Sequence, residues 1–122
     1  SGRRHLDEAL LATGTQFGSR GDAKRFVNLI EKIMPVTAGL RRLGAAALDL
    51  AFVAAGRFEG YFEMNLQPWD LAAGAIIIKE AGGYICDFNG EKDYLTSGDV
   101  IAANEPIFLE LKQLICPRAP KL

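Results

Sequence analysis

The chain has 122 residues, of which 49% are hydrophobic and 24% charged, and its formal net charge is −1 at pH 7. This length fits one domain, and the apolar content excludes a disordered or fibrous chain. The near-zero charge argues against a protein that binds nucleic acid along a basic surface. No apolar run reaches the roughly 18 residues that a membrane-spanning helix needs. We therefore expect a single soluble domain. The start at Ser1, without Met or an apolar signal segment, suggests that an upstream segment has been removed.

The cysteines, Cys86 and Cys116, are too few for a disulfide scaffold and fit a reducing cytosol. The single histidine, His5, lies near the start of the chain, so we do not expect Cys–His catalysis, and no pair of Cys or His has the ligand spacing of a zinc site. We expect both cysteines to be buried as small hydrophobic residues.

The first third of the chain predicts one clear helix. Residues 6–11 fit either a helical turn or a short strand, and their spacing does not separate the two. Over residues 22–34, apolar side chains recur at three- and four-residue spacing, with Asp22 as the expected N-cap and Pro35 ending the helix. Residues 36–42 are expected to form an extended connector.

Two further helices frame a strand in the middle of the chain. The alanine-rich residues 43–56 predict a helix that ends at Gly56, in which Asp49 is a capping or polar-network residue. Residues 58–64 predict a strand. Pro68 and Asp70 are typical of a first helical turn, so a helix is expected from there to Ala81. Trp69 is expected to pack in the core.

The last third predicts a strand at 84–88, a turn at Asn89–Gly90, a strand at 100–103 and a helix that opens at Glu105–Pro106. Residues 117–122 are expected to form a flexible tail after a domain at 1–116. This alternation of helices and short strands indicates an α/β fold, with helices flanking a sheet.

Asp70 is the best candidate for chemistry. The N-terminal turn of a helix favours a carboxylate and can also receive a phosphate, because its amide groups have no partners within the helix. A carboxylate there could anchor a divalent cation that bridges to a phosphate. The alternative is that Asp70 only stabilises its helix, which is the commoner role of an acidic residue in a first turn.

Several motifs resemble one family. The order of Pro68-Trp69-Asp70-Leu71-Ala72-Ala73-Gly74 and Glu80-Ala81-Gly82-Gly83 is similar to the C-terminal signature of the inositol monophosphatases. Residues 41–50, 54–57, 60–63 and 101–104 match the same family in register. The resemblance covers residues 6–115 and implies the C-terminal half of the inositol monophosphatase-like sugar-phosphatase fold, a mixed β-sheet flanked by helices.

The resemblance also implies site residues. The family's N-terminal half carries a metal-binding glutamate and a D-P-x-D-G-T segment, and neither occurs in this chain. Asp70 takes the position of a Mg²⁺ ligand near the substrate hydroxyls, and Glu63 that of a glutamate that binds an inositol hydroxyl. Gly44, Ala45 and Ala46 take positions that line the substrate. No catalytic water-activating residue is expected in this half, so we expect the chain alone to be inactive.

The function implied is cytoplasmic, Mg²⁺-dependent hydrolysis of inositol 1-phosphate or a related sugar phosphate by the intact protein, with homodimerisation common in the family. An alternative is a non-catalytic partner of the transcription antitermination machinery, as for some bacterial members, with Arg41 and Arg42 as contact residues. A third possibility is that the isolated half self-associates through the face left by its missing partner.

Overall fold

The computed structural model describes residues 4–14, 20–42 and 46–116. Its centre is one mixed sheet of five strands in the order β2-β1-β3-β5-β4. The strands are β1 (Leu10–Thr13), β2 (Gly39–Arg41), β3 (Gly60–Glu63), β4 (Tyr84–Cys86) and β5 (Val100–Ala103). β1 runs parallel to both β2 and β3, whereas β5 is antiparallel to β3 and β4. The predicted α/β class is confirmed.

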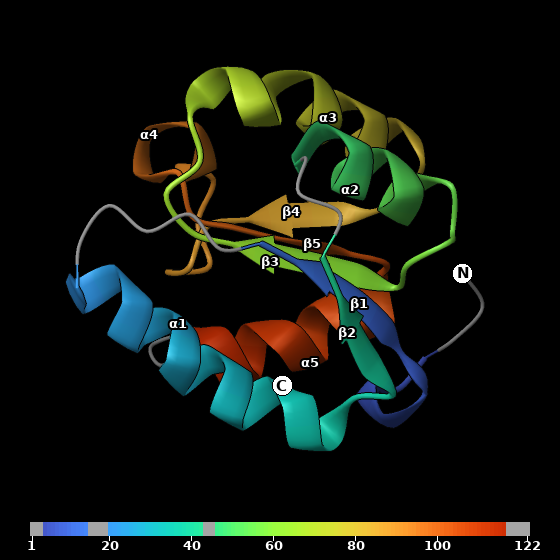
Figure 1. Cartoon of the computed structure of the whole chain (residues 1–122). Helices are drawn as coiled ribbons and strands as arrows, with labels where there is room; N and C mark the ends of the chain where they lie inside the picture. Colours follow the sequence, from blue (N-terminus) through green and yellow to red (C-terminus); the bar gives the residue numbers. More distant parts are fainter. Residues whose placement is uncertain (1–3, 15–19, 43–45, 117–122) are drawn as a thin grey trace.

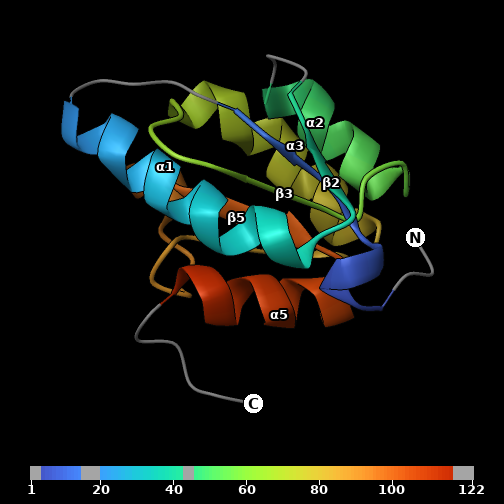
Figure 2. The same cartoon turned by 60° about the horizontal axis from the view of Figure 1, so that its bottom comes forward.

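Helices cover both faces of this sheet. They are α1 (Arg20–Ile33), α2 (Ala46–Ala54), α3 (Pro68–Glu80), α4 (Tyr94–Ser97) and α5 (Glu105–Ile115), with short 3-10 turns at Leu6–Glu8 and Met34–Val36. Figure 1 and Figure 2 show α2 and α3 on one face and α1 and α5 on the other. Each face therefore has its own core.

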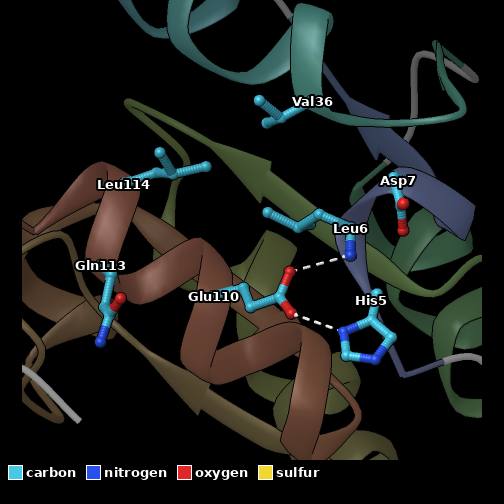
Figure 3. Close-up of a pocket in the computed structure, with 7 residues that line it drawn as sticks. All are labelled: His5, Leu6, Asp7, Val36, Glu110, Gln113 and Leu114. Carbon is cyan, nitrogen blue, oxygen red and sulfur yellow. Dashed lines mark hydrogen bonds and ion pairs between the residues drawn. The ribbon is translucent and has the colours of Figure 1, made fainter.

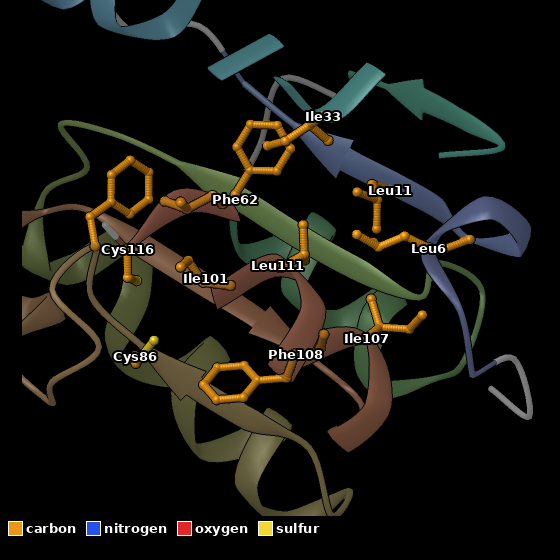
Figure 4. Packing of buried hydrophobic residues seen from close by; sticks show 14 of the residues in the cluster. Leu6, Leu11, Ile33, Phe62, Cys86, Ile101, Ile107, Phe108, Leu111 and Cys116 are labelled. Carbon is orange, nitrogen blue, oxygen red and sulfur yellow. The ribbon is translucent and has the colours of Figure 1, made fainter. Parts of the chain in front are cut away.

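The alternation of side chains along β3 separates the two cores. Phe62 points toward α1 and α5 and packs with Leu11 and Leu111 in the cluster of Figure 4. Tyr61 points the other way and packs with Leu50 and other residues of the α2–α3 side. Glu63 lies two residues after Tyr61, and a period of two places its side chain on the α2–α3 face as well.

The N-terminal third differs from the sequence prediction in two places. Residues 6–11 contain both expected structures in succession, a 3-10 turn and the start of β1. α1 begins at Arg20, so Asp22 lies inside the first turn and its assignment as the N-cap was wrong. The helix does end before Pro35, as predicted. The expected connector at 36–42 contains β2, which pairs with β1 and is too short to show an alternating pattern.

The later elements agree with the prediction more closely. α3 begins at Pro68, β5 spans residues 100–103, and the Asn104 side chain accepts a hydrogen bond from the Ile107 N–H (3.1 Å) at the start of α5. α2 ends before Gly56, whose φ of 79° is left-handed. The short helix α4 was not predicted, because four residues carry no helical period. Residues 43–45 and the expected tail at 117–122 lie outside the described residues.

Two expectations about burial had opposite outcomes. Cys86 and Cys116 are both buried free thiols, as predicted. The prediction that Trp69 packs in the core was wrong, because this side chain is 75% exposed. The apolar sequence of α3 does not distinguish the side of the helix that this sheet covers from the side that it leaves open.

Candidate functional site

Two parallel strands bring the first part of the site together. Because β1 and β3 are parallel, both chains leave the sheet at the same edge, where Gly14 follows β1 and Glu63 ends β3. A Cβ atom at position 14 would lie only 2.1 Å from the Glu63 Oε1. Any larger residue at position 14 would therefore force the Glu63 carboxylate to move. From the sequence, the segment Gly14–Gly18 was interpreted as a loop near the substrate, but the close approach of Gly14 to Glu63 was not predicted.

The Glu63 carboxylate is held in one orientation. Glu63 is 4% exposed, and the Tyr61 hydroxyl donates a hydrogen bond of 2.5 Å to its Oε1. Burial raises the pKa of Tyr61 well above its ordinary value, and the charges of Glu63, Asp49 and Asp70 raise it further. Tyr61 therefore keeps its proton and acts as a permanent donor to Glu63.

Asp70 lies in the first turn of α3, as predicted. Its Oδ2 accepts a hydrogen bond from the Gln67 N–H (3.0 Å), so part of this carboxylate fixes the start of the helix. The side chain is half-buried. The helix α3 packs on the face of the sheet that carries Tyr61, so Asp70 lies on the same side of the sheet as the Tyr61–Glu63 pair.

Asp49 adds a third carboxyl group on the same side of the sheet. It lies in the first turn of α2 and is 1% exposed, and neither of its oxygens has a hydrogen-bond partner among the described residues. Burial, followed by the charge of Glu63, raises its pKa to about 6. The capping or polar-network role expected for Asp49 is therefore not observed. Its burial beside Glu63 could not be inferred from an alanine-rich helix.

Within residues 4–14, 20–42 and 46–116, the other buried polar side chains have partners. The Thr13 hydroxyl donates to the Phe62 carbonyl (2.8 Å), and a Glu59 carboxylate oxygen accepts from the Leu10 N–H. Buried polar groups in native proteins are rarely left without a partner. The bare carboxyl group of Asp49 is thus the exception among the described residues.

Some of the predicted site residues cannot be placed in this arrangement. Gly44 and Ala45 lie outside the described residues, and Ala46 is the first residue of α2. Arg41 and Arg42 are exposed, and the Arg41 Nη1 donates to the Leu40 carbonyl (2.9 Å).

Asp70 is the residue among these side chains that best fits a magnesium ligand. Asp70 is an oxygen ligand of the type that Mg²⁺ prefers, and only its Oδ2 has a described hydrogen bond, so the residue fits as one ligand. Mg²⁺ is usually bound by one or two carboxylates together with substrate phosphates and waters. The described residues thus fit part of a magnesium site.

A separate acidic group lies in the turn after β4. Carboxylate oxygens of Asp87, Glu91 and Asp93 are within 4.8 Å of one another. The Asp87 Oδ1 accepts hydrogen bonds from the Asn89 N–H (2.8 Å) and the Glu91 N–H (2.9 Å). These bonds explain the buried Asp87 as the residue that shapes the turn predicted at Asn89–Gly90.

One pocket lies on the other face of the molecule. Its volume is about 570 Å³, and Figure 3 shows it between α5 and the two 3-10 turns. The Glu110 carboxylate accepts from the Leu6 N–H (2.8 Å) and contacts the His5 ring (3.3 Å) at its wall. None of the predicted site residues lines this pocket, so it is distinct from the candidate site.

A search of the described residues found no helix that is long and apolar enough to cross a membrane.

Comparison with known proteins places this geometry in a family. The model of the inositol monophosphatase family matches residues 1–120. The putative Nus factor SuhB of Neisseria meningitidis is 44% identical over 115 residues, which are 94% of this chain and 44% of that protein. The Nus factor SuhB of Pseudomonas aeruginosa is 43% identical over 122 residues.

Solved structures of related proteins share the fold of this chain. The extragenic suppressor protein suhB of Bartonella henselae has a TM-score of 0.89 and 39% identity over 98% of this chain and 45% of that one. The inositol monophosphatase of Thermotoga maritima has a TM-score of 0.82 and 35% identity. The chain thus spans less than half the length of these relatives. The match over residues 1–120 and the shared fold show that the chain belongs to the inositol monophosphatase family.

Proposed function

We propose that this chain supplies the substrate-binding wall and one metal ligand of a Mg²⁺-dependent phosphatase that hydrolyses inositol 1-phosphate or a related sugar phosphate. The observation that carries the proposal is the buried Glu63 carboxylate, oriented by Tyr61 on the face of the sheet that α3, with Asp70 in its first turn, also covers. The family model that matches the chain and the inositol monophosphatase structures that resemble it support this reaction class.

The roles of the residues follow from their chemistry. An oriented carboxylate accepts hydrogen bonds from the hydroxyl groups of a polyol, and Glu63 has one oxygen occupied by Tyr61 and little room to turn beside Gly14. The N-terminus of α3 favours the negative charge of a phosphate. Bound Mg²⁺ would supply neutralisation of the phosphate charge and activation of water. Asp70 is the side chain of this chain that would hold the ion.

This half cannot perform the reaction by itself in our proposal. One aspartate leaves a Mg²⁺ ion short of protein ligands, and the water-activating group would have to come from residues beyond this chain. The chain spans 44% and 45% of the Neisseria and Pseudomonas relatives, which leaves more than half of those proteins to supply them.

Replacement of Glu63 tests whether this side chain binds the substrate. In a family-length protein that contains this chain, Glu63→Gln should raise the KM for inositol 1-phosphate more than it lowers kcat, because it weakens hydroxyl binding and leaves the phosphate site intact. Glu80→Gln, at the exposed end of α3, is the matched control. An unchanged KM in Glu63→Gln would remove Glu63 from the substrate wall.

A second function is favoured by the names of the relatives. The curated relatives from Neisseria, Pseudomonas and Escherichia coli are named as Nus factors or putative Nus factors, and we propose as the alternative a non-catalytic contact with the transcription machinery. Arg41 and Arg42 are exposed and could make that contact. Retention of RNA polymerase by the immobilised protein, lost on Arg41→Ala/Arg42→Ala, would support it; retention of polymerase by the doubly substituted protein would exclude these arginines.

A further inference from the structure

Two buried thiol groups meet in the core on the α1–α5 face of the sheet. Cys86 ends β4 and Cys116 is the C-cap of α5, so they come from two elements that are far apart in the sequence. They are 4% and 2% exposed, and neither forms a disulfide. Both belong to the cluster of Figure 4, which shows them at the same end of it. Folding therefore brings together the two cysteines of the chain.

The two thiol groups are in contact, and both are held by regular structure. The Cys86 thiol forms a hydrogen bond with the Cys116 sulfur. The Cys116 Sγ also lies 3.8 Å from the carbonyl oxygen of Asp87, the residue after Cys86. The Cys116 N–H donates to the Lys112 carbonyl (2.8 Å), and Cys86 is fixed by the pairing of β4 with β5. The pair is thus positioned by the fold.

The surroundings of the pair favour a thiolate at Cys116. The hydrogen bond from Cys86 lowers the pKa of the Cys116 thiol. The charge of Lys112 and the N–H of Gly90 act in the same direction, whereas burial and the charge of Asp87 oppose them. The same hydrogen bond, together with burial, raises the pKa of Cys86. Cys116 is therefore the group that loses its proton first, and a thiolate is the nucleophilic form of cysteine.

A metal site is the alternative role for two neighbouring cysteines. A structural zinc ion is bound by four ligands, usually Cys and His. In the part of the chain that the structure describes, the one cluster of three or more possible metal ligands is Asp87, Glu91 and Asp93, which includes neither cysteine. The pair therefore fits thiol–disulfide chemistry better than metal binding.

A cavity beside the pair gives a small oxidant a route toward it. Its volume is about 290 Å³, and it is lined by Phe88 and by Ile115, which directly precedes Cys116. Arg25 and Lys32 of α1 also line this cavity. A space with polar and charged walls admits water, and hydrogen peroxide is a solute of similar size and polarity. Cys116 is thus one residue away from a space that a peroxide can enter.

We propose that Cys86 and Cys116 form a redox-active dithiol, which a hydroperoxide oxidises to an intramolecular disulfide. The Cys116 thiolate attacks one oxygen of hydrogen peroxide. An S–O bond forms, the O–O bond breaks, and the hydroxide that is released takes up a proton and leaves as water. The Cys86 sulfur then attacks the sulfenic acid of Cys116. The S–S bond forms, the S–O bond breaks, and the hydroxyl group leaves with the Cys86 proton as a second water.

The two thiols lose two electrons in this reaction and the peroxide gains them. The new bond joins the edge strand β4 to the end of α5. The dithiol lies in the core on the α1–α5 face, whereas Tyr61 packs in the core on the α2–α3 face. This inference therefore goes beyond the proposed function and does not depend on it.

The intact mass of the 122-residue chain tests the reaction directly, because the chain has two cysteines. Hydrogen peroxide added to the folded, reduced chain should remove two hydrogen atoms from its mass and leave no thiol that iodoacetamide modifies after denaturation. The chain should stay monomeric on a non-reducing gel, and dithiothreitol should restore both thiols. A disulfide between two chains, or oxidation that stops at sulfenic or higher acids, would overturn the proposal.

Urea titrations test whether the fold positions the pair. The equilibrium constant of unfolding should be roughly a hundredfold lower for the oxidised chain than for the reduced chain, because the bond closes a loop of about 30 residues in the unfolded state. An equilibrium constant that is equal or higher after oxidation would contradict a pair that is positioned for the bond.

Substitutions assign the two roles. Cys86→Ser keeps a hydrogen-bond donor beside Cys116, so peroxide should give a Cys116 sulfenic acid that dimedone traps. Cys86 in the Cys116→Ser variant should be oxidised at least about tenfold more slowly. Lys112→Gln should slow disulfide formation, whereas Lys24→Gln, at an exposed lysine of α1, is the matched control and should not. Circular dichroism verifies that each variant is folded. Oxidation of Cys86 at the same rate as Cys116, or faster, would overturn the assignment of Cys116 as the attacking group.

Discussion

Replacement of Asp49 by Asn tests whether this buried carboxyl group is protonated in the folded chain. Asp49 is 1% exposed and has no described hydrogen-bond partner. The pKa of Asp49 rises from 3.8 to about 6 in the folded chain, first through burial and then through Glu63. In the unfolded chain the group loses its proton near its ordinary pKa. The folded chain therefore holds a proton between about pH 4 and pH 6 that the unfolded chain has released, and the free energy of unfolding falls as the pH rises through this range.

The magnitude follows from the two pKa values. A pKa that is about two units higher in the folded state corresponds to a loss of roughly 3 kcal/mol above pH 6 relative to pH below 4. Asn is neutral at every pH, so Asp49→Asn removes this loss. The variant should gain up to about 3 kcal/mol relative to the wild type between pH 4 and pH 8, in addition to a pH-independent difference for the buried amide.

Urea unfolding at pH 4 and pH 8 measures this gain. Asp7→Asn, at an exposed aspartate of the first 3-10 turn, is the matched control for loss of a surface carboxylate. A free-energy difference between wild type and Asp49→Asn that is the same at both pH values would refute the reasoning. It would show that Asp49 has a partner in solution that keeps its carboxylate ionised.

Three other substitutions have definite expected outcomes. Gly74→Ala should lower the free energy of unfolding by about 1–2 kcal/mol in urea titrations, because the new Cβ would lie 2.4 Å from the Leu50 Cδ1 where α2 meets α3. Equal stability of the variant and the wild type would show that Leu50 moves aside without cost. Asn104→Ala should cost about 1 kcal/mol in the same titrations, because it removes the N-cap of α5. Gly14→Ala should displace Glu63 and shift its side-chain carboxyl resonance in NMR spectra; an unchanged resonance would contradict the close approach.

Local signals in the sequence predicted much of this fold. Pro68 before an apolar run gave the start of α3, and Gly56 gave the end of α2, because both residues act through their own backbone geometry. β2 was missed because three residues show no alternation, and it becomes a strand only by pairing with β1. Trp69 was placed in the core for a related reason: the pattern of α3 contains two apolar sides, and the sequence does not say which side meets this sheet.

The candidate site likewise contains residues that the sequence indicated and residues that only the folded structure brings together. Resemblance to the family indicated Glu63 and Asp70, and their roles in binding stay predictions. Gly14 and Asp49 were not assigned to the site, because the relation of each to Glu63 arises only in the folded chain. The parallel pairing of β1 with β3 brings Gly14 beside Glu63, and the packing of α2 buries Asp49 on the face of the sheet where the charge of Glu63 acts on it. Gly44 and Ala45 stay predictions outside the described residues.

The central claim is that this chain holds one half of a phosphatase site around Asp70. Phosphate release from inositol 1-phosphate in the presence of Mg²⁺, measured for the family-length protein, for its Asp70→Asn variant and for the 122-residue chain alone, tests it most directly. We expect release by the family-length protein, a decrease of orders of magnitude in Asp70→Asn, and none from the chain alone. Unchanged release by Asp70→Asn, or Asp70-dependent release by the isolated chain, would contradict the account.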